Sequence, residues 1–155
     1  MRSVTSTLDR GVSIVDVMRS RLVAVAPDTA GRAAIGRMAE ADVGSVVVCD
    51  GSRLVGIFTE RDVLRLAGEG VDLDATRVAD VMTRDVATVT PDTDLLAAAR
   101  LMGERRVRHL PVVEGENVLG VVGIRDILGV LTERLWRTRD EDARETVHEL
   151  LSRRS

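Results

Sequence analysis

The sequence predicts an α+β fold in which two β-α-β-β-α repeats pack with pseudo-twofold symmetry, followed by a helical tail. Two observations support this fold class. The segments that begin at Asp16 and Asp80 share Asp-Val-Met, Pro-Asp-Thr and a closing Arg-Asp. They align without a gap at an offset of 64 residues, the difference between positions 16 and 80. Each segment also alternates β-branched runs with stretches of helical periodicity. Because one copy alone is too small to bury a large core, the two copies are expected to pack together.

Each copy opens with a short extended stretch that leads through Pro-Asp-Thr into a helix. The extended stretches are LVAV at 22–25 and VATV at 86–89. Thr29 and Thr93 are expected to cap the helices, since a threonine hydroxyl can accept a hydrogen bond from a free amide of the first turn. Apolar residues at helical spacing then predict the buried side of each helix: Ala34, Ile35 and Met38 in the first copy, and Leu95, Ala98, Leu101 and Met102 in the second.

A hairpin and a second helix complete each copy. The runs VGSVVV and VRHLPVV predict one strand, and LVGIF and VLGVV predict the next. Asp50-Gly51 and Glu114-Gly115 stand between these strands and are typical of hairpin turns. The final helix of each copy is expected to start near Thr59 or Gly123.

The repeats divide the chain into five segments. We predict an N-terminal tail at 1–11, repeat 1 at 12–68, a glycine-containing linker at 69–75, repeat 2 at 76–131 and a charged helical tail at 132–155. The tail has as many arginines as acidic residues, which suits a solvated helix with ion pairs. Trp136 in this tail suggests packing onto the body or across a dimer, whereas a frayed charged helix is the alternative.

Composition excludes several classes of function. The protein has 155 residues and a formal net charge of −3, and all 22 of its basic residues are arginine. Nucleic-acid binding is not expected, because basic faces and aromatic stacking platforms are its usual devices, and the chain has one Phe, one Trp and no Tyr. Schiff-base or P-loop lysine chemistry is excluded, and no nucleophile–base set indicates an enzyme.

The same reading predicts a cytoplasmic protein. Cys49 is the single cysteine, so no disulfide can form within the chain. The first residues contain no apolar stretch typical of a signal peptide, and no apolar run approaches the length of a membrane span.

The stretch GIFTERD, from Gly56 to Asp62, indicates the site chemistry. It places Thr59 and Asp62 at a corner between a strand and a helix, and GVVGIRD repeats it with Gly123 in place of the threonine. The Thr-x-x-Asp spacing is also that of a capping box, and this structural role is compatible with ligand binding. This corner also carries a carboxylate at Asp62 and a guanidinium at Arg61.

The tandem repeat, Pro-Asp-Thr, RHLPVV and Gly-x-x-Thr-x-x-Asp together resemble a pair of cystathionine β-synthase (CBS) domains over roughly 12–131. The resemblance is to the stand-alone regulatory type. It implies binding of AMP, ADP, ATP or S-adenosylmethionine in clefts between the repeats, and assembly into a homodimer. It implies no required cofactor.

The resemblance also implies two crossed sites, each joining the corner of one repeat to the strands of the other. The stronger site would comprise Thr59, Arg61, Asp62, Val86, Ala87, Val107, Arg108, His109, Pro111 and Arg125. The weaker site would comprise Leu22, Val23, Val43, Val47 and Asp126. Because Gly123 supplies no hydroxyl, we expect this site to be weaker, altered in specificity or empty.

Three other residues have simpler readings. His109 is either a partly buried structural histidine or a pH-sensitive anion ligand. His148 is expected in solvent, and Cys49 in a buried strand. Their spacing is not that of a metal site. The leading function is therefore a regulatory module that senses an adenosine-containing ligand. The alternative is a dimeric protein-interaction scaffold with unused clefts, with a partner bound through the C-terminal tail.

Overall fold

The computed structural model describes residues 14–18, 22–137 and 141–152, without the side chains of 135–137 and 141–143. These residues form two compact units. The first-repeat unit holds residues 22–86 and 114–119, and the second-repeat unit holds 14–18, 87–113, 120–137 and 141–152. The strands of the second hairpin are described with the second-repeat unit, to which most of their residues belong.

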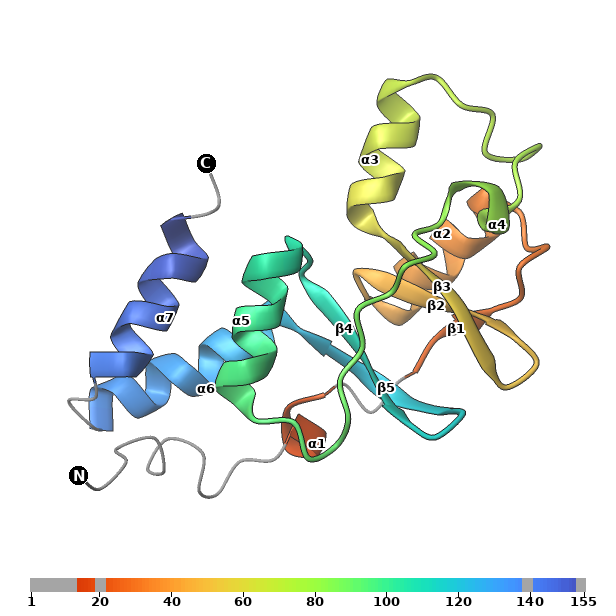
Figure 1. Ribbon diagram of the computed structural model, residues 1–155. Coiled ribbons are helices and arrows are strands. Elements are labelled where there is room, and N and C mark those ends of the chain that lie inside the picture. Colours follow the sequence, from red (N-terminus) through yellow and green to blue (C-terminus); the bar gives the residue numbers. More distant parts are fainter. Residues whose placement is uncertain (1–13, 19–21, 138–140, 153–155) are drawn as a thin grey trace. The chain divides into compact units, whose positions relative to one another are not determined.

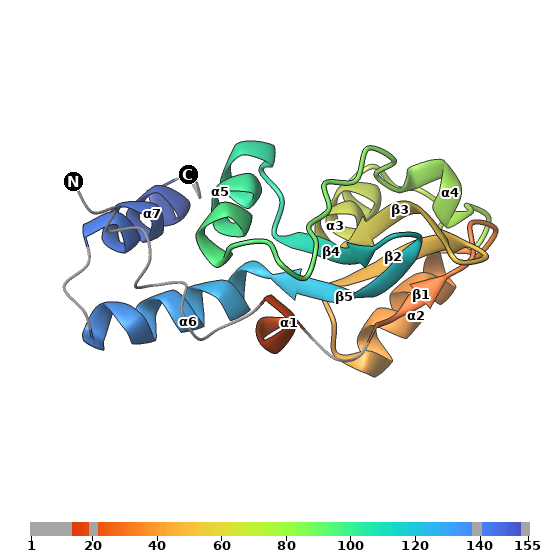
Figure 2. The ribbon, with the colours of Figure 1, turned by 60° about the horizontal axis from the view of Figure 1, so that its bottom comes forward.

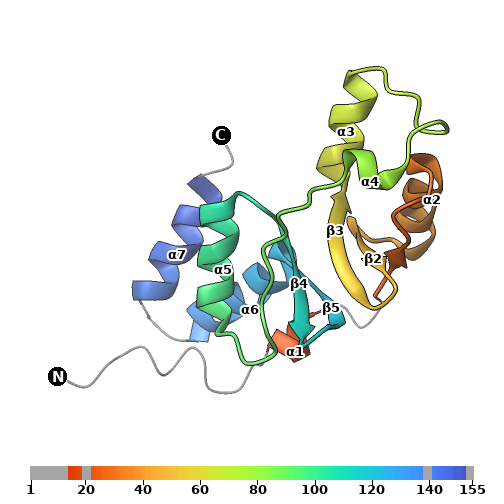
Figure 3. The same cartoon turned by 45° about the vertical axis from the view of Figure 1, so that its right-hand side comes forward.

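The first-repeat unit contains a three-stranded sheet with its helices (Figure 1). Its elements are β1 (Ala24–Val25), α2 (Gly31–Ala41), β2 (Ser45–Asp50), β3 (Arg53–Thr59), α3 (Glu60–Gly68) and α4 (Val78–Val81). Strand β2 lies between the other two, parallel to β1 and antiparallel to β3. Helix α2 lies beside β2, and α3 continues directly from the end of β3 (Figure 3). The predicted β-α-β-β-α order is confirmed.

The second-repeat unit repeats this order in a reduced form. Its elements are α1 (Ile14–Val17), α5 (Leu95–Arg105), β4 (His109–Glu114), β5 (Asn117–Gly123), α6 (Ile124–Arg137) and α7 (Glu141–Ser152). The predicted strand at 86–89 is reduced to one parallel bridge between Val89 and Val112. The Val89 amide donates to the carbonyl of Pro111 at 3.0 Å, and the Val113 amide donates to the carbonyl of Val89 at 2.8 Å.

Matching backbone details support the 64-residue offset. Gly51 and Gly115 occupy the two hairpin turns with φ values of 62° and 60°, a conformation that glycine adopts at little cost. Asp42 and Arg106 end α2 and α5 in the left-handed region, with φ values of 52° and 54°. Two copies of one sequence pattern have therefore kept the same turns and the same helix ends.

The starts of the first long helices differ from the prediction. Helices α2 and α5 begin one residue later than expected, so their N-caps are Ala30 and Asp94 rather than Thr29 and Thr93. Oδ1 of Asp94 accepts hydrogen bonds from the next helical amides, at 2.7 and 3.2 Å. Thr93 instead closes the preceding turn, where its hydroxyl accepts from the Thr90 amide at 3.0 Å. A short carboxylate is as good a cap as a hydroxyl, and aspartate occupies the position that faces the amides.

Ala30 has no side-chain oxygen, and α2 is capped by the backbone of residues 69–76, the predicted linker extended by one residue and called the linker from here on. The amide of Gly31 donates to the carbonyl of Thr76 at 2.8 Å, and the amide of Arg32 donates to the carbonyl of Leu73 at 3.0 Å. Leu73 is itself part of the core of this unit. The linker is therefore a packed segment that satisfies amides left free at the start of α2.

Each unit has its own aliphatic core, as the near absence of aromatics predicts. Val46, Val48 and the single Phe58 are fully buried in the first, and Leu110, Val112, Val122 and Ile127 in the second. The helix residues predicted to face inward are buried or half-buried. Ile14 of α1 packs into the second core and Val78 of α4 into the first. These two residues are equivalent under the 64-residue offset, so each repeat places its first helix in the core of the other unit.

The C-terminal helix α7 packs against α5 and α6 (Figure 2). Thr146 is buried, and Val147 and Leu150 are half-buried against the core of this unit. The tail thus packs onto the body, which is one of the arrangements predicted. The side chain of Trp136, on which that prediction rested, lies outside the described side chains.

Candidate functional site: two strand-to-helix corners

The first corner is the junction between β3 and α3, where Thr59 and Asp62 form a capping box. The Thr59 amide donates to Oδ2 of Asp62 at 2.9 Å, and the Thr59 hydroxyl donates to the same oxygen at 3.3 Å. The structural role expected for this pair is confirmed. Both hydrogen bonds go to one oxygen, and the Asp62 side chain remains 13% exposed. Oδ1 is therefore free of the cap.

The same corner is fixed to the neighbouring strand. Ser45, a buried residue at the start of β2, lies opposite Thr59 in the strand register. The amide of Glu60, the first residue of α3, donates to the carbonyl of Gly44 at 3.0 Å. These contacts orient the first turn of α3 relative to the sheet, and they leave the amides of that turn at one defined place.

The other predicted site residues of the first-repeat unit lie on or beside its strands. The Val47 amide donates to the carbonyl of Val23 at 3.1 Å, so LVAV and β2 are neighbours in the sheet. Val47 is fully buried, whereas Leu22, Val23 and Val43 are half-buried. Val86 is half-buried, and Arg61 is exposed on α3. The first-repeat unit therefore contains both a polar corner and a group of apolar residues on or beside its strands.

The second corner is the junction between β5 and α6, and it keeps the backbone of the first. The Ile124 amide donates to the carbonyl of Arg108 at 2.9 Å, which matches the bond between Glu60 and Gly44. A Cβ atom placed on Gly123 would lie 3.3 Å from Oδ2 of Asp126 and 4.0 Å from Cδ2 of His109. The space of the missing threonine side chain is thus bordered by the Asp126 carboxylate and the His109 imidazole.

The remaining predicted residues of the second-repeat unit divide by burial. Pro111 is buried, and Ala87 and Val107 are half-buried against the core. Arg108 and Arg125 are exposed, and both adjoin the hydrogen bond that fixes the second corner. His109 is half-buried at the start of β4, as the structural reading of this residue expected.

The two corners belong to different units. The residues assigned to the stronger crossed site fall in both units, and so do those of the weaker site. Each unit by itself brings together one corner and strand residues of its own repeat, except that Val86 of repeat 2 falls in the first-repeat unit. The crossed pairing implied by the resemblance stays a prediction.

Arg65 is a polar residue near the first corner that the sequence analysis missed. It lies three residues after Asp62 on α3, and its Nη2 atom is 3.6 Å from Oδ1 of Asp62. The signal that could have found it is the i,i+3 spacing of opposite charges on a helix.

Other candidate centres are weak. Cys49 is half-buried in β2, and burial raises the pKa of its thiol, which leaves less of the reactive thiolate. His148 is exposed on α7, as predicted. Among the described residues, no three or more His, Cys, Asp or Glu side chains are placed to hold a metal ion.

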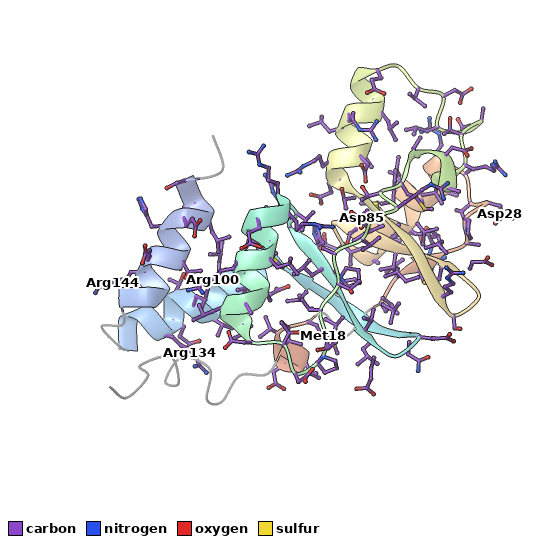
Figure 4. All side chains as sticks on the ribbon, in the orientation of Figure 1. Met18, Asp28, Asp85, Arg100, Arg134 and Arg144 are labelled. Carbon is purple, nitrogen blue, oxygen red and sulfur yellow. The ribbon has the colours of Figure 1, made fainter. Side chains whose placement is uncertain are left out.

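A small hollow of about 100 Å³ lies between α5 and α7. Arg100 of α5 points toward α7 here (Figure 4), and Glu149 and Leu150 of α7 line the other side. Pockets for drug-sized ligands usually measure about 300–1,000 Å³, so this hollow is too small for a nucleoside. It is not a second candidate for the predicted ligand.

The geometry of the two repeats is that of a known family. The model of the CBS domain family matches residues 14–69 and 78–133, so the chain belongs to the CBS domain family.

Three known proteins illustrate the likeness. Arabinose 5-phosphate isomerase KdsD of Yersinia pestis is 37% identical over 118 residues, which cover 74% of this chain and 36% of the isomerase. A putative signal-transduction protein with CBS domains from Burkholderia ambifaria is 31% identical, with a TM-score of 0.71, over 76% of this chain and 91% of that one. A CBS domain protein of Pyrobaculum aerophilum, solved in complex with AMP, is 25% identical, with a TM-score of 0.72, over 79% of this chain and 97% of that one.

The chain thus spans about a third of the isomerase that it matches. It matches nearly the whole of the two solved CBS proteins. Among the described helices, none is long and apolar enough to cross a membrane.

Proposed function

We propose that this protein is a regulatory module that binds an adenosine-containing ligand, with Asp62 as the ribose-binding carboxylate. The observation that carries the proposal is the first corner. Thr59 holds one oxygen of the Asp62 carboxylate, while the other oxygen is free of the cap at the start of α3. The AMP complex of the Pyrobaculum aerophilum protein supports this class of ligand.

The residues of the first corner bind different parts of the ligand. Asp62 accepts hydrogen bonds from the ribose diol, and the positive end of the α3 dipole together with Arg61 attracts the phosphate. In the crossed arrangement, apolar residues of the second repeat form the slot for adenine, and its basic residues join Arg61 at the phosphate. The first group is Val86, Ala87, Val107 and Pro111; the second is Arg108, His109 and Arg125.

The second corner forms a weaker site. Asp126 keeps the carboxylate, but Gly123 gives it no hydroxyl partner. In the crossed arrangement the strand residues of this site are Leu22, Val23, Val43 and Val47. We propose that AMP, ADP, ATP or S-adenosylmethionine occupies the first site preferentially.

Ligand binding regulates by favouring one of two arrangements of a cytoplasmic homodimer. A ligand can shift that equilibrium only by as much as its affinity differs between the two states. The role proposed is therefore binding and signalling rather than catalysis, and light scattering with and without ligand measures the oligomeric state.

A second candidate function is a dimeric scaffold for a protein partner. The observation that favours it is Leu64, a large apolar side chain that is 77% exposed on α3. If the clefts are unused, substitutions at Asp62 should leave the function of the protein intact.

Isothermal titration of the nucleotide-stripped protein with AMP, ADP, ATP and S-adenosylmethionine tests the first candidate. Binding of at least one ligand is expected. Asp62→Ala should weaken it on the order of ten- to a hundredfold, because it removes charge-assisted hydrogen bonds to the ribose. Absence of heat with all four ligands would contradict the proposal.

Two variants control for charge and for capping. Asp74→Ala removes an exposed carboxylate of the same unit that pairs with Arg32 at 2.7 Å, and it should leave affinity unchanged. Asp62→Asn keeps an oxygen for the Thr59 amide, so it separates loss of the ribose contact from loss of the cap. Asp126→Ala should weaken binding less than Asp62→Ala, and equal losses would show that the ranking of the two corners is wrong.

A further inference from the structure

Arg65 connects the Asp62 carboxylate to two other groups of the first-repeat unit. Its Nη2 atom lies 3.6 Å from Oδ1 of Asp62 and donates to the carbonyl of Val81, the last residue of α4, at 3.5 Å. Its Nη1 atom lies 3.7 Å from Oε1 of Glu69, just beyond the end of α3. The half-exposed guanidinium thus has three acceptors at 3.5, 3.6 and 3.7 Å.

The two oxygens of Asp62 are held in different ways. Oδ2 accepts hydrogen bonds from the amide and the hydroxyl of Thr59. The distance of 3.6 Å between Oδ1 and Arg65 is longer than a good hydrogen bond, so this contact is electrostatic and leaves the Oδ1 lone pairs available. Thr59 and Arg65 therefore contact different oxygens of the carboxylate, and Oδ1 keeps its capacity to accept.

We propose that Arg65 is a positioning residue that sets the specificity of the first corner for a ribose diol. The inference rests on the proposed function. Arg65 does not contact the ligand in this proposal; it keeps Oδ1 of Asp62 turned toward the position of the ribose hydroxyls. A carboxylate held from both sides can accept from two adjacent hydroxyls without first losing rotational freedom, and such preorganisation favours the ligand that offers both donors.

The second corner lacks this arrangement at both positions. The residue equivalent to Thr59 is Gly123, and the residue equivalent to Arg65 is Gly129. Asp126 therefore has neither of the side chains that hold Asp62. The difference between the corners is larger than the missing hydroxyl alone, and it predicts that only the first corner discriminates strongly between ribose and 2′-deoxyribose.

The test compares ribonucleotides with their 2′-deoxy counterparts. The full chain, stripped of nucleotide, is titrated with AMP, 2′-deoxy-AMP, ATP and 2′-deoxy-ATP. Arg65→Gln should weaken the ribonucleotide that binds by about three- to tenfold, the size of one modest hydrogen bond, and should change the 2′-deoxy affinity less than about twofold. Arg65→Lys should recover part of the discrimination, since a lysine keeps the charge but lacks the planar fork.

Arg77→Gln is the matched control. Arg77 belongs to the same unit, and its guanidinium pairs with Asp80 at 3.3 Å rather than with Asp62. This variant should leave both affinities and their ratio unchanged.

The outcomes of the titration distinguish the possible roles of Arg65. A loss of affinity confined to the ribonucleotide supports the inference. Equal losses for the ribonucleotide and its 2′-deoxy form would show that Arg65 only stabilises the fold. No loss in Arg65→Gln, in a protein whose binding Asp62→Ala weakens, would overturn the role of Arg65 and leave the proposed function standing. Failure of the unaltered protein to bind AMP or ATP would overturn this inference, and failure with all of the earlier ligands would overturn the proposed function as well.

Discussion

The two repeats have the same turns and helix ends, but different groups cap the starts of their helices. At the first long helix, the second repeat uses the carboxylate of Asp94, whereas the first repeat has Ala30 and uses carbonyls of the linker. At the last helix the asymmetry is reversed, because Thr59 caps α3 and Gly123 offers no side chain to α6. Free amides at a helix start must be satisfied, but the source of the acceptor can diverge between copies. The second corner has therefore lost its side-chain cap in a repeat whose first long helix keeps one.

The helices that follow the corners differ in the same way. Leu64 on α3 is 77% exposed, whereas its equivalent on α6, Leu128, is half-buried. Ala67 is exposed, whereas its equivalent Leu131 is 1% exposed. Helix α7 packs on α6 and α5, and its Val147 and Leu150 pack against the core that contains Leu131. The tail is thus part of the second-repeat unit, and changes in the tail test this difference between the two helices.

The largest effect on stability is expected in α7. Leu150 is half-buried against the core, so Leu150→Ala should cost about 1–2 kcal/mol, less than the ~2–5 kcal/mol of a fully buried leucine. Leu151→Ala is the matched control, because its side chain is 50% exposed and should cost only a few tenths of a kcal/mol. Urea unfolding followed by circular dichroism measures both. Equal small effects would show that the tail does not stabilise the second repeat.

The next effect concerns the starts of α2 and α5. Asp94→Ala should cost about 0.5–2 kcal/mol, the usual penalty for losing an N-cap. Ala30→Asp should gain much less, because linker carbonyls already accept from the amides of Gly31 and Arg32. The same urea experiment, made with both variants, compares the two values. A gain from Ala30→Asp as large as the loss from Asp94→Ala would mean that the linker does not cap α2.

Much of the fold follows from the sequence. The repeat, the hairpin turns and the buried helix faces were all predictable, because glycine conformation and helical periodicity are local properties. The exchange of Ile14 and Val78 between the two cores was not, since their short helices carry no signal that names a packing partner. The predicted boundaries at 12–68 and 76–131 follow the repeat in the sequence, whereas the compact units follow the exchange.

The site was also predictable only where its contacts are local in the sequence. The capping box of Thr59 and Asp62 follows from the four-residue motif 59–62, since its hydrogen bonds join residues of one turn. The linker cap of α2 and the contact between Arg65 and Val81 join residues more distant in the chain. Such contacts depend on how segments fold back, and residue types alone do not specify them.

The smallest effect on stability is expected when the second corner is given the side chains of the first. Gly123 has no positive φ, and a Cβ there would meet Oδ2 of Asp126 at 3.3 Å, so a threonine fits if the carboxylate moves by a few tenths of an ångström. Gly123→Thr should stabilise the protein by roughly 0.4–1 kcal/mol, mainly by restricting the unfolded chain. Gly129 is exposed, with nothing within 4 Å of a Cβ, so Gly129→Arg can add the second partner. The double variant should therefore bind the ribonucleotide more tightly at its weaker site, in a titration that resolves two classes of site. A gain in stability without any gain in affinity would mean that the strands, and not the corner, limit binding at that site.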